Sequence, residues 1–392
     1  MGNGSTDASI CEECLLLGVD VIHAEQVRDY GILGPKPSDL CALLDQYVIG
    51  QDAAKRIIAV AVYNHRKRLQ VKPEGATELD KSNILLIGPT GSGKTFIMQM
   101  LARSLLVPLA IADATSLTEA GYVGDDVENI IGKLFRQSDF NVEKTQQGIV
   151  YIDEIDKIAR KTDNTRRDVG GEGVQQALLK LIEGTTVTLP NKSNVRNSRN
   201  IPEFVEIDTK NILFVCGGAF DGLDRVIHAR TTRSSIGFGA ELRGPASTSK
   251  EALFGLAEPE DLIQFGMIPE IVGRLPVIAR CEESSVLGLV DILTKPKNSL
   301  LRQFRKLFDM DGAELDVSPE ALLAIAEKAF ARKLGARGLR SILEELFLDA
   351  QFELPSLPRG EKYKIVLTED AVLSGHGAII ESVPVLKSVS AL

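Results

Sequence analysis

Tryptophan is absent from the 392-residue sequence, and histidine and cysteine are scarce, with four and five residues. Five cysteines cannot all pair, and their scattered positions predict no disulfide framework, which favours a reducing compartment. No apolar run reaches the roughly 18 residues of a membrane-spanning helix. Neither a signal-peptide core nor an Arg-rich transit segment is recognisable. We therefore expect a bacterial cytoplasmic protein, and an organelle matrix stays open if a transit segment was removed.

Basic residues are outnumbered, since 45 Lys and Arg against 54 Asp and Glu give a net charge of −9 at pH 7. Proteins that bind nucleic acid through their overall charge are usually basic, so this balance argues against that as the main function. The fractions of hydrophobic residues (44%) and charged residues (25%) are those of a globular protein rather than a disordered one. The length predicts two or three domains.

Glycine and proline punctuate residues 1–38, and Pro37 disfavours helix at the residue before it, so we place a domain boundary at residue 38. Residues 39–282 carry apolar runs of strand length that alternate with helical stripes. Continuous apolar strands are typical of a sheet covered on both faces, so the alternation predicts an α/β fold with a parallel sheet. The five runs are Ile84–Ile87, Leu109–Ala112, Ile149–Ile152, Ile212–Cys216 and Pro276–Ala279.

Two apolar stripes at helical spacing, over 127–135 and 174–182, lie between these runs. Helical stripes then dominate residues 283–392, where Tyr363–Leu367 is the one late strand candidate. We therefore predict a second, smaller and mainly helical domain over 283–392. The polar stretch 185–203 is predicted to be a surface loop.

One segment matches the phosphate-binding pattern G-x-x-x-x-G-K-[ST] in full: Gly88, Pro89, Thr90, Gly91, Ser92, Gly93, Lys94 and Thr95. It follows a predicted strand and opens a predicted helix, which is the context that the motif requires. Backbone N–H groups of such a loop cradle phosphate oxygens beside the positive end of the helix. Lys94 can reach the β- and γ-phosphates, and the Thr95 hydroxyl can ligate Mg²⁺. The alternative is a Gly-rich turn with a solvated lysine.

A pair of carboxylates, Asp153 and Glu154, ends the apolar run Ile149–Ile152. The carboxyl edge of a parallel sheet is where ligands of α/β folds bind. Asp153 suits coordination of Mg²⁺, and Glu154 suits activation of a water for attack on the γ-phosphate. A solvated strand end is the alternative for the pair taken alone. The guanine-reading N-K-x-D pattern is absent, so ATP is the expected nucleotide.

Together with further motifs, these segments resemble those of the ClpX family of AAA+ ATPases over about residues 39–370. The resemblance implies an AAA+ large domain with a P-loop parallel sheet and flanking helices, followed by a small domain. It also implies an ATP-dependent protein unfoldase that forms a homohexamer and feeds unfolded substrates to a ClpP-type peptidase. Besides the phosphate loop and the carboxylate pair, the matching motifs are Tyr47–Gln51, Gly121–Gly124, Ile236–Phe238, Gly273–Pro276 and Gly335–Arg337.

Two of these motifs are implied to contact other proteins. Tyr122 and Val123 are similar to the family's pore loop, where an aromatic side chain between glycines grips the substrate polypeptide. From the residues alone, an ordinary turn with a buried tyrosine is the alternative. Ile236, Gly237 and Phe238 are similar to the tripeptide that engages the peptidase, and a loop end tucked into its own core is the alternative.

Other positions are implied to act on the nucleotide. Arg274 is similar to an arginine finger, which stabilises the charge that develops on the γ-phosphate bound to a neighbouring subunit. Arg337 is similar to the sensor-2 arginine, which links the nucleotide state to domain rotation. Val48 and Ile49 are similar to the adenine pocket. Solvated arginines and plain core packing are the respective alternatives.

The N-terminal segment departs from the family, which carries two C-x-x-C pairs in a zinc domain. Only Cys11 and Cys14 are present here, as a match to the second pair. They are the candidate Zn²⁺ ligands, but a closed structural site needs four.

The sequence thus predicts an ATP- and Mg²⁺-dependent protein unfoldase and translocase, with no membrane or nucleic-acid partner. None of the four histidines accompanies a nucleophile motif, so proteolysis requires another chain. Two alternatives stay open: a remodelling chaperone that works without a protease, and a nucleic-acid motor.

Overall fold

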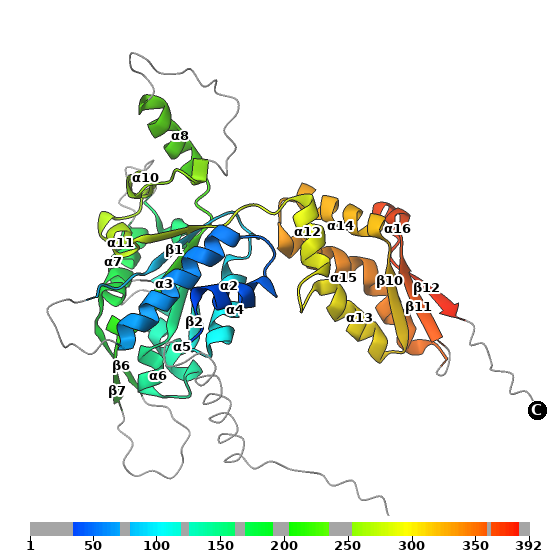
Figure 1. Ribbon diagram of the computed structural model, residues 1–392, viewed down its shortest axis with the longest axis horizontal. Helices are drawn as coiled ribbons and strands as arrows, with labels where there is room; N and C mark the ends of the chain where they lie inside the picture. Colours follow the sequence, from blue (N-terminus) through cyan, green and yellow to red (C-terminus); the bar gives the residue numbers. More distant parts are fainter. Residues whose placement is uncertain are drawn as a thin grey trace, which may run out of the picture.

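The computed structural model describes residues 34–70, 79–118, 125–160, 169–190, 204–234, 253–358 and 362–383. These residues form two lobes that lie side by side in Figure 1. The first lobe contains the elements between residues 37 and 280, and the second contains those between 286 and 383. A short segment without helix or strand, 281–285, joins the two lobes.

The first lobe is built on a five-stranded sheet in which all neighbouring strands are parallel. The strand order is β2 (Leu109–Asp113), β5 (Ile149–Asp153), β8 (Leu213–Gly218), β1 (Ile84–Ile87) and β9 (Val277–Arg280). All five apolar runs are therefore strands, which confirms the predicted parallel α/β sheet. The observed bounds differ from the predicted ones by at most two residues.

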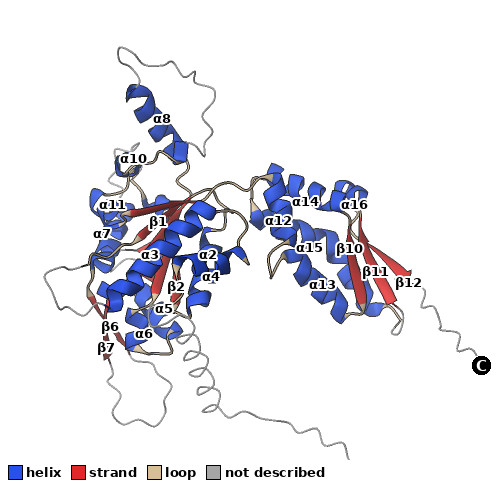
Figure 2. Ribbon diagram, in the orientation of Figure 1, coloured by secondary structure: helices blue, strands red, loops and turns tan. Residues whose placement is uncertain are grey.

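Helices cover both faces of this sheet, as Figure 2 shows. Alternate strand residues point to opposite faces and enter two separate cores. On one face, Leu86 and Tyr151 pack with α2 (Pro37–Asp45), α3 (Asp52–Gln70) and α4 (Lys94–Leu105). On the other face, Ile87 and Ile152 pack with a larger set of helices. This set includes α5 (Asn129–Gln137), α7 (Val169–Glu183), α8 (Leu223–Ser234), α10 (Pro259–Phe265) and α11 (Pro269–Arg274), with α6 (Val142–Gln146) beside α5.

The prediction of a surface loop over 185–203 was wrong for its first part. Residues Thr186–Pro190 form strand β6, which pairs antiparallel with β7 (Phe204–Asp208). The physical reason is strict alternation, since Val187 and Leu189 are buried while Thr186, Thr188 and Pro190 face solvent. Residues 191–203 lie outside the described part of the chain. A second small pairing is parallel, between β3 (Leu117–Thr118) and β4 (Asp125–Asp126).

The second lobe packs helices against a three-stranded sheet, and its helices confirm the predicted helical character. The helices are α12 (Val286–Thr294), α13 (Leu300–Met310), α14 (Pro319–Ala331), α15 (Ala336–Glu353) and α16 (Glu369–Ser374). The strands are β10 (Ala313–Val317), β11 (Lys362–Leu367) and β12 (Ile379–Val383). The sequence predicted only β11. Ser285, Ser299 and Ser318 cap α12, α13 and α14 by accepting backbone N–H bonds.

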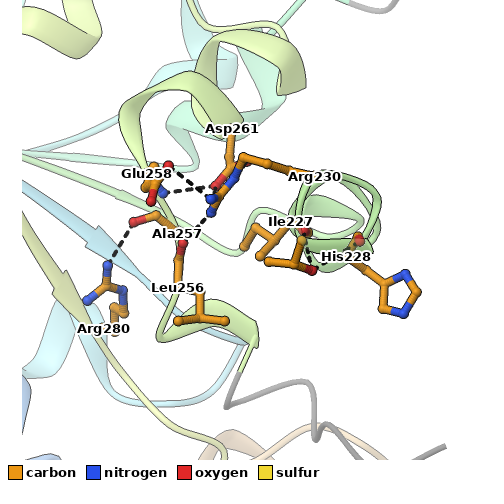
Figure 3. A network of polar contacts seen from close by, with 9 residues as sticks. Ile227, His228, Arg230, Leu256, Ala257, Glu258, Asp261 and Arg280 are labelled. Atoms are coloured by element: carbon orange, nitrogen blue, oxygen red, sulfur yellow. Dashed lines mark hydrogen bonds and ion pairs between the residues drawn. The ribbon is translucent and has the colours of Figure 1, made fainter. Parts of the chain in front are cut away.

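An arginine on α8 joins that helix to the start of α10 (Figure 3). The Arg230 Nε and Nη2 atoms donate to the two carboxylate oxygens of Asp261 at 2.8 and 3.0 Å, and Nη1 lies 2.9 Å from Glu258 Oε2. The Asp261 side chain is buried, whereas that of Glu258 is largely exposed. Arg280, at the end of β9, donates to the Ala257 carbonyl oxygen at 2.9 Å. The start of α10 is therefore held between α8 and the central sheet.

Within the described ranges, none of the helices combines the length and the apolar character that crossing a bilayer requires.

Candidate nucleotide site

The predicted phosphate loop connects β1 to α4 at the carboxyl edge of the central sheet. Gly91 and Gly93 adopt φ angles of +81° and +92°, in the left-handed region that favours glycine. Lys94 and Thr95 form the first turn of α4 and line the same cavity as the loop. The loop and the positive end of the helix thus meet at one cavity, as binding of an anion requires.

Lys94 is almost fully buried in this loop. Its ammonium donates to the carbonyl oxygens of Gly88 at 2.6 Å and of Pro89 at 3.0 Å. Burial lowers the pKa of Lys94, and the nearby Asp153 and Asp156 carboxylates act in the opposite direction. The Lys94 side chain therefore lies at the base of the loop, where it can meet phosphate oxygens.

The two predicted carboxylates lie at the end of β5, where Asp153 is its last residue and Glu154 follows it. The Thr95 hydroxyl donates to Asp153 Oδ2 at 2.6 Å, which brings the two predicted Mg²⁺ ligands together. On the other oxygen, Asp153 Oδ1 accepts from the Tyr151 hydroxyl at 3.2 Å and from the Glu154 amide at 3.0 Å. Burial raises the pKa of Tyr151 well above its ordinary value, so its hydroxyl keeps its proton. Glu154 has φ +57°, which turns its backbone away from the strand direction.

A cavity of about 680 Å³ lies between the two lobes and is lined by residues from both. Of the residues predicted to act on the nucleotide within one chain, Thr90–Thr95, Val48, Ile49, Asp153, Glu154 and Arg337 line it. Pro89 is not among the lining residues and contributes through its carbonyl bond to Lys94. The cavity size is typical of pockets for small ligands.

Several lining residues were missed by the sequence reasoning. Tyr47 precedes the predicted pair Val48 and Ile49, while Ile292, Pro296 and Arg340 come from the second lobe. Arg340 could have been found, because it follows Arg337 by three residues and so shares its face of α15. Ile292 and Pro296 carried no such signal, since only the packing of the two lobes brings them to the site.

The two lobes contact each other directly at the phosphate loop. The Ala336 amide donates to the Gly91 carbonyl oxygen at 3.4 Å, and a Cβ atom on Gly91 would lie 2.4 Å from the Leu334 carbonyl oxygen. A second contact joins the Lys297 amide to the Gln46 carbonyl oxygen at 2.9 Å. Backbone hydrogen bonds therefore hold the two lobes against each other beside the cavity that both of them line.

The segment that carries Val48 and Ile49 is fixed on both sides. Lys55, buried on α3, donates to the Val48 carbonyl oxygen at 3.1 Å and pairs with Asp45. Gln51 exchanges two hydrogen bonds with the backbone of Glu282, each 2.8 Å long. Because Glu282 lies in the segment between the lobes, this pair ties the apolar wall of the cavity to the interlobe connection.

Arg274 lies outside the cavity of its own chain. It ends α11, and its Nε and Nη2 atoms both lie 2.9 Å from Glu183 Oε1 at the end of α7. More than half of the Arg274 side chain is exposed. In this chain it therefore makes no contact with the phosphate loop.

The other predicted site residues lie outside the described part of the chain: Tyr122, Val123, Ile236, Gly237, Phe238, Cys11 and Cys14. Among the residues that are described, no group of three or more His, Cys, Asp or Glu side chains could hold a metal ion.

The residues present fit a nucleotide with its magnesium ion. Oxygen donors are the ligands that Mg²⁺ prefers, usually one or two from the protein with phosphate and water for the rest. The Thr95 hydroxyl and the Asp153 carboxylate supply such a pair, 2.6 Å apart, beside the glycine loop. The apolar side chains of Val48 and Ile49 have the character expected for contact with a base, and the cationic side chains of Arg337 and Arg340 line the same cavity.

Comparison with known families agrees with this geometry. The AAA domain (Cdc48 subfamily) matches residues 79–278, which include the phosphate loop, the carboxylate pair and Arg274. The C-terminal, D2-small domain of ClpB protein matches residues 288–362, which cover most of the second lobe and Arg337. The chain belongs to the AAA domain family (Cdc48 subfamily) and is an ATPase.

Proposed function

We propose that this ATPase is a protein unfoldase and translocase of the ClpX kind, which works as a homohexamer and delivers substrates to a ClpP-type peptidase. In this proposal residues 39–282 form the large domain, residues 283–392 the small domain, and residues 1–38 a separate leader. The observation that supports it best is the position of the cavity between two lobes. A nucleotide held there contacts both lobes, so its hydrolysis changes the angle between them.

Within one chain, the roles follow the geometry around the phosphate loop. We assign the loop amides and Lys94 to the phosphates, and Thr95 and Asp153 to the magnesium ion. The ion, when bound, neutralises charge on the phosphate oxygens. Glu154 lines the same cavity, where its carboxylate orients a water and accepts its proton.

Arg274 is proposed to act on the neighbouring subunit. It lies outside its own cavity, it is more than half exposed, and it ends a helix on the surface of the first lobe. Such a side chain can complete the cleft of an adjacent copy, where a guanidinium stabilises the charge that develops during phosphoryl transfer. Arg337, on the second lobe of the same chain, would report whether the γ-phosphate is present.

Two segments outside the described residues carry the proposed contacts with other proteins. Tyr122 and Val123 follow β3 and precede β4, and we assign them to gripping the substrate. Ile236, Gly237 and Phe238 come directly after α8, and we assign them to the peptidase. The anchoring of α8 through Arg230 gives this second segment a fixed base.

The proposal is tested by mixing the protein with ATP, a ClpP-type peptidase and a stably folded substrate that carries an unstructured tail. We expect degradation only when all components are present, and loss of degradation, with ATPase activity retained, when Ile236–Phe238 are deleted. Degradation that is unaffected by the deletion contradicts the assignment of that segment.

A protease-independent remodelling chaperone is the second candidate, and the match of residues 288–362 to the small domain of ClpB favours it. It predicts unfolding of the substrate without any effect of the deletion or of the peptidase. A nucleic-acid motor predicts instead that DNA or RNA stimulates the ATPase and that folded proteins do not.

A further inference from the structure

Tyr151 is a polar side chain in the core for which the sequence motifs provide no role. It lies in the middle of β5 and is completely buried, among the apolar side chains of α3 and α4. Residues two apart on a strand share one face of the sheet, so Tyr151 lies on the same face as Asp153. A phenylalanine would fill this position without a polar atom to satisfy, which makes the hydroxyl the feature to explain.

The hydroxyl of Tyr151 reaches Asp153 from inside the protein. It donates to Oδ1 at 3.2 Å, while Oδ2 of the same carboxylate accepts from Thr95 at 2.6 Å. Oδ1 also accepts from the Glu154 amide at 3.0 Å. One oxygen is therefore held by two donors on the protein side, and the other is left facing the hydroxyl of Thr95. This arrangement fixes the rotation of the carboxylate about its Cβ–Cγ bond.

The neighbouring strand leaves room for this hydroxyl. Gly217 lies in β8, next to β5, and a Cβ atom there would be 2.1 Å from the Tyr151 hydroxyl oxygen and 2.7 Å from Cζ. No side chain larger than glycine can occupy that position while Tyr151 keeps its place. Glycine at the end of β8 therefore provides the space that the Tyr151 hydroxyl occupies, as expected if the position of this hydroxyl is important for the site.

We propose that Tyr151 is a positioning residue of the ATPase, which orients the Asp153 carboxylate so that Oδ2 and the Thr95 hydroxyl together present oxygens to Mg²⁺. The inference rests on the magnesium role proposed for Thr95 and Asp153. Partners that hold metal ligands from behind usually contribute to metal affinity by restricting the ligand to one orientation.

The test is a binding measurement on Tyr151→Phe in the full-length protein. Binding of a fluorescent ADP is titrated at several concentrations of free Mg²⁺ and in EDTA. We expect unchanged affinity in EDTA and a rise of about tenfold in the Mg²⁺ concentration that gives half of the magnesium-dependent gain. Tyr363→Phe is the matched control, because it removes another buried tyrosine hydroxyl, bonded to the Pro358 carbonyl oxygen 3.2 Å away in the second lobe. It should bind as the parent does.

An unchanged magnesium dependence in Tyr151→Phe overturns the inference. Asp153→Asn separates this failure from failure of the underlying proposal, since it must itself abolish the magnesium-dependent gain if Asp153 holds the ion. If Tyr151→Phe lowers the unfolding midpoint so far that binding cannot be measured, Gly217→Ala decides, because its Cβ displaces the hydroxyl without removing it. We expect the same shift in magnesium dependence there, and its absence rejects the inference.

Discussion

The Ala336 amide of the second lobe donates to the carbonyl oxygen of Gly91 in the phosphate loop, with an N···O distance of 3.4 Å. Gly91 itself has φ +81°, and the Leu334 carbonyl oxygen occupies the space where its Cβ would be. The predicted phosphate loop is therefore also a surface that the second lobe contacts. We therefore expect a change at the nucleotide to be transmitted to the second lobe through this contact.

Gly91→Ala should weaken nucleotide binding by at least about tenfold, because it combines left-handed backbone strain of about 1–2 kcal/mol with displacement of the second lobe. A fluorescent nucleotide measures the affinity. Gly312→Ala is the matched control, since Gly312 has a similar φ of +82° and open space at its Cβ position. It carries the strain alone and should leave affinity unchanged. Equal losses of nucleotide affinity in the two variants would exclude the interlobe contact as the cause.

Glu154→Gln should bind ATP with the affinity of the parent and lower kcat by a factor of roughly 10² to 10⁴, the usual contribution of a general base. The reason is that the amide keeps the shape of the side chain but cannot accept the proton of water. Binding of labelled ATP and release of phosphate, measured on the same preparation, give the two quantities. Turnover close to that of the parent would exclude Glu154 as the base.

Arg274→Ala should be inactive alone and recover activity when mixed with Glu154→Gln. The first variant keeps an intact cavity and the second keeps Arg274, so a mixed ring contains complete sites only if Arg274 acts between subunits. Phosphate release from the mixture should exceed the sum of the two separate variants. Arg225→Ala, which removes an exposed arginine on α8, should behave as the parent. An additive mixture contradicts action in trans.

The burial of His65 predicts that the folded protein loses stability as the pH falls. Burial lowers its pKa from 6.5 to about 4. As the pH falls, the unfolded chain therefore takes up the proton first, and stability is lost from about pH 6.5 down to about pH 4. The full effect is about 3 kcal/mol, and His65→Leu should remove it, which flattens the free energy of unfolding across that range. Denaturant unfolding at stepped pH gives the slope. If the free energy of unfolding depends on pH in the same way in the parent and in His65→Leu, His65 is not buried in its neutral form.

Asp261→Asn should lower the unfolding midpoint of the first lobe by several degrees, because it leaves Arg230 without the charged partner that is buried in the fold. Glu258→Gln tests the other partner of the same arginine, which is largely exposed, and should change the midpoint little. Thermal unfolding followed by circular dichroism compares the two. Similar decreases of the unfolding midpoint in the two variants would show that the burial of Asp261 does not make its ion pair with Arg230 stronger than that of Glu258.

The sequence predicted those helices, strands and candidate site residues that a local pattern of residues identifies. The five apolar runs identified the central sheet, and the glycine loop was found by its full match to the phosphate-binding pattern. The carboxylates were found because they end an apolar strand at the carboxyl edge of the sheet. Arg337 came from family resemblance, and the three-residue spacing to Arg340 could have added that second arginine.

The strands that were not predicted are those that form through pairing with a neighbouring strand rather than through a strong β propensity of their own residues. Strand β10 (Ala313–Val317) alternates acidic and apolar residues over a short run, and β12 becomes a strand only beside β11. Strand β6 was hidden in a polar stretch, since Val187 and Leu189 alone mark its buried face. Tyr151 was missed as a site residue because no local pattern distinguishes it from a core aromatic.

The most direct test of the account follows the native fluorescence of a stably folded, tail-bearing substrate during ATP hydrolysis, with the peptidase present to prevent refolding. The account predicts a steady loss of fluorescence with ATP and none with Glu154→Gln, although that variant binds ATP. If fluorescence persists while the parent hydrolyses ATP, hydrolysis at the interlobe cavity is not coupled to protein unfolding.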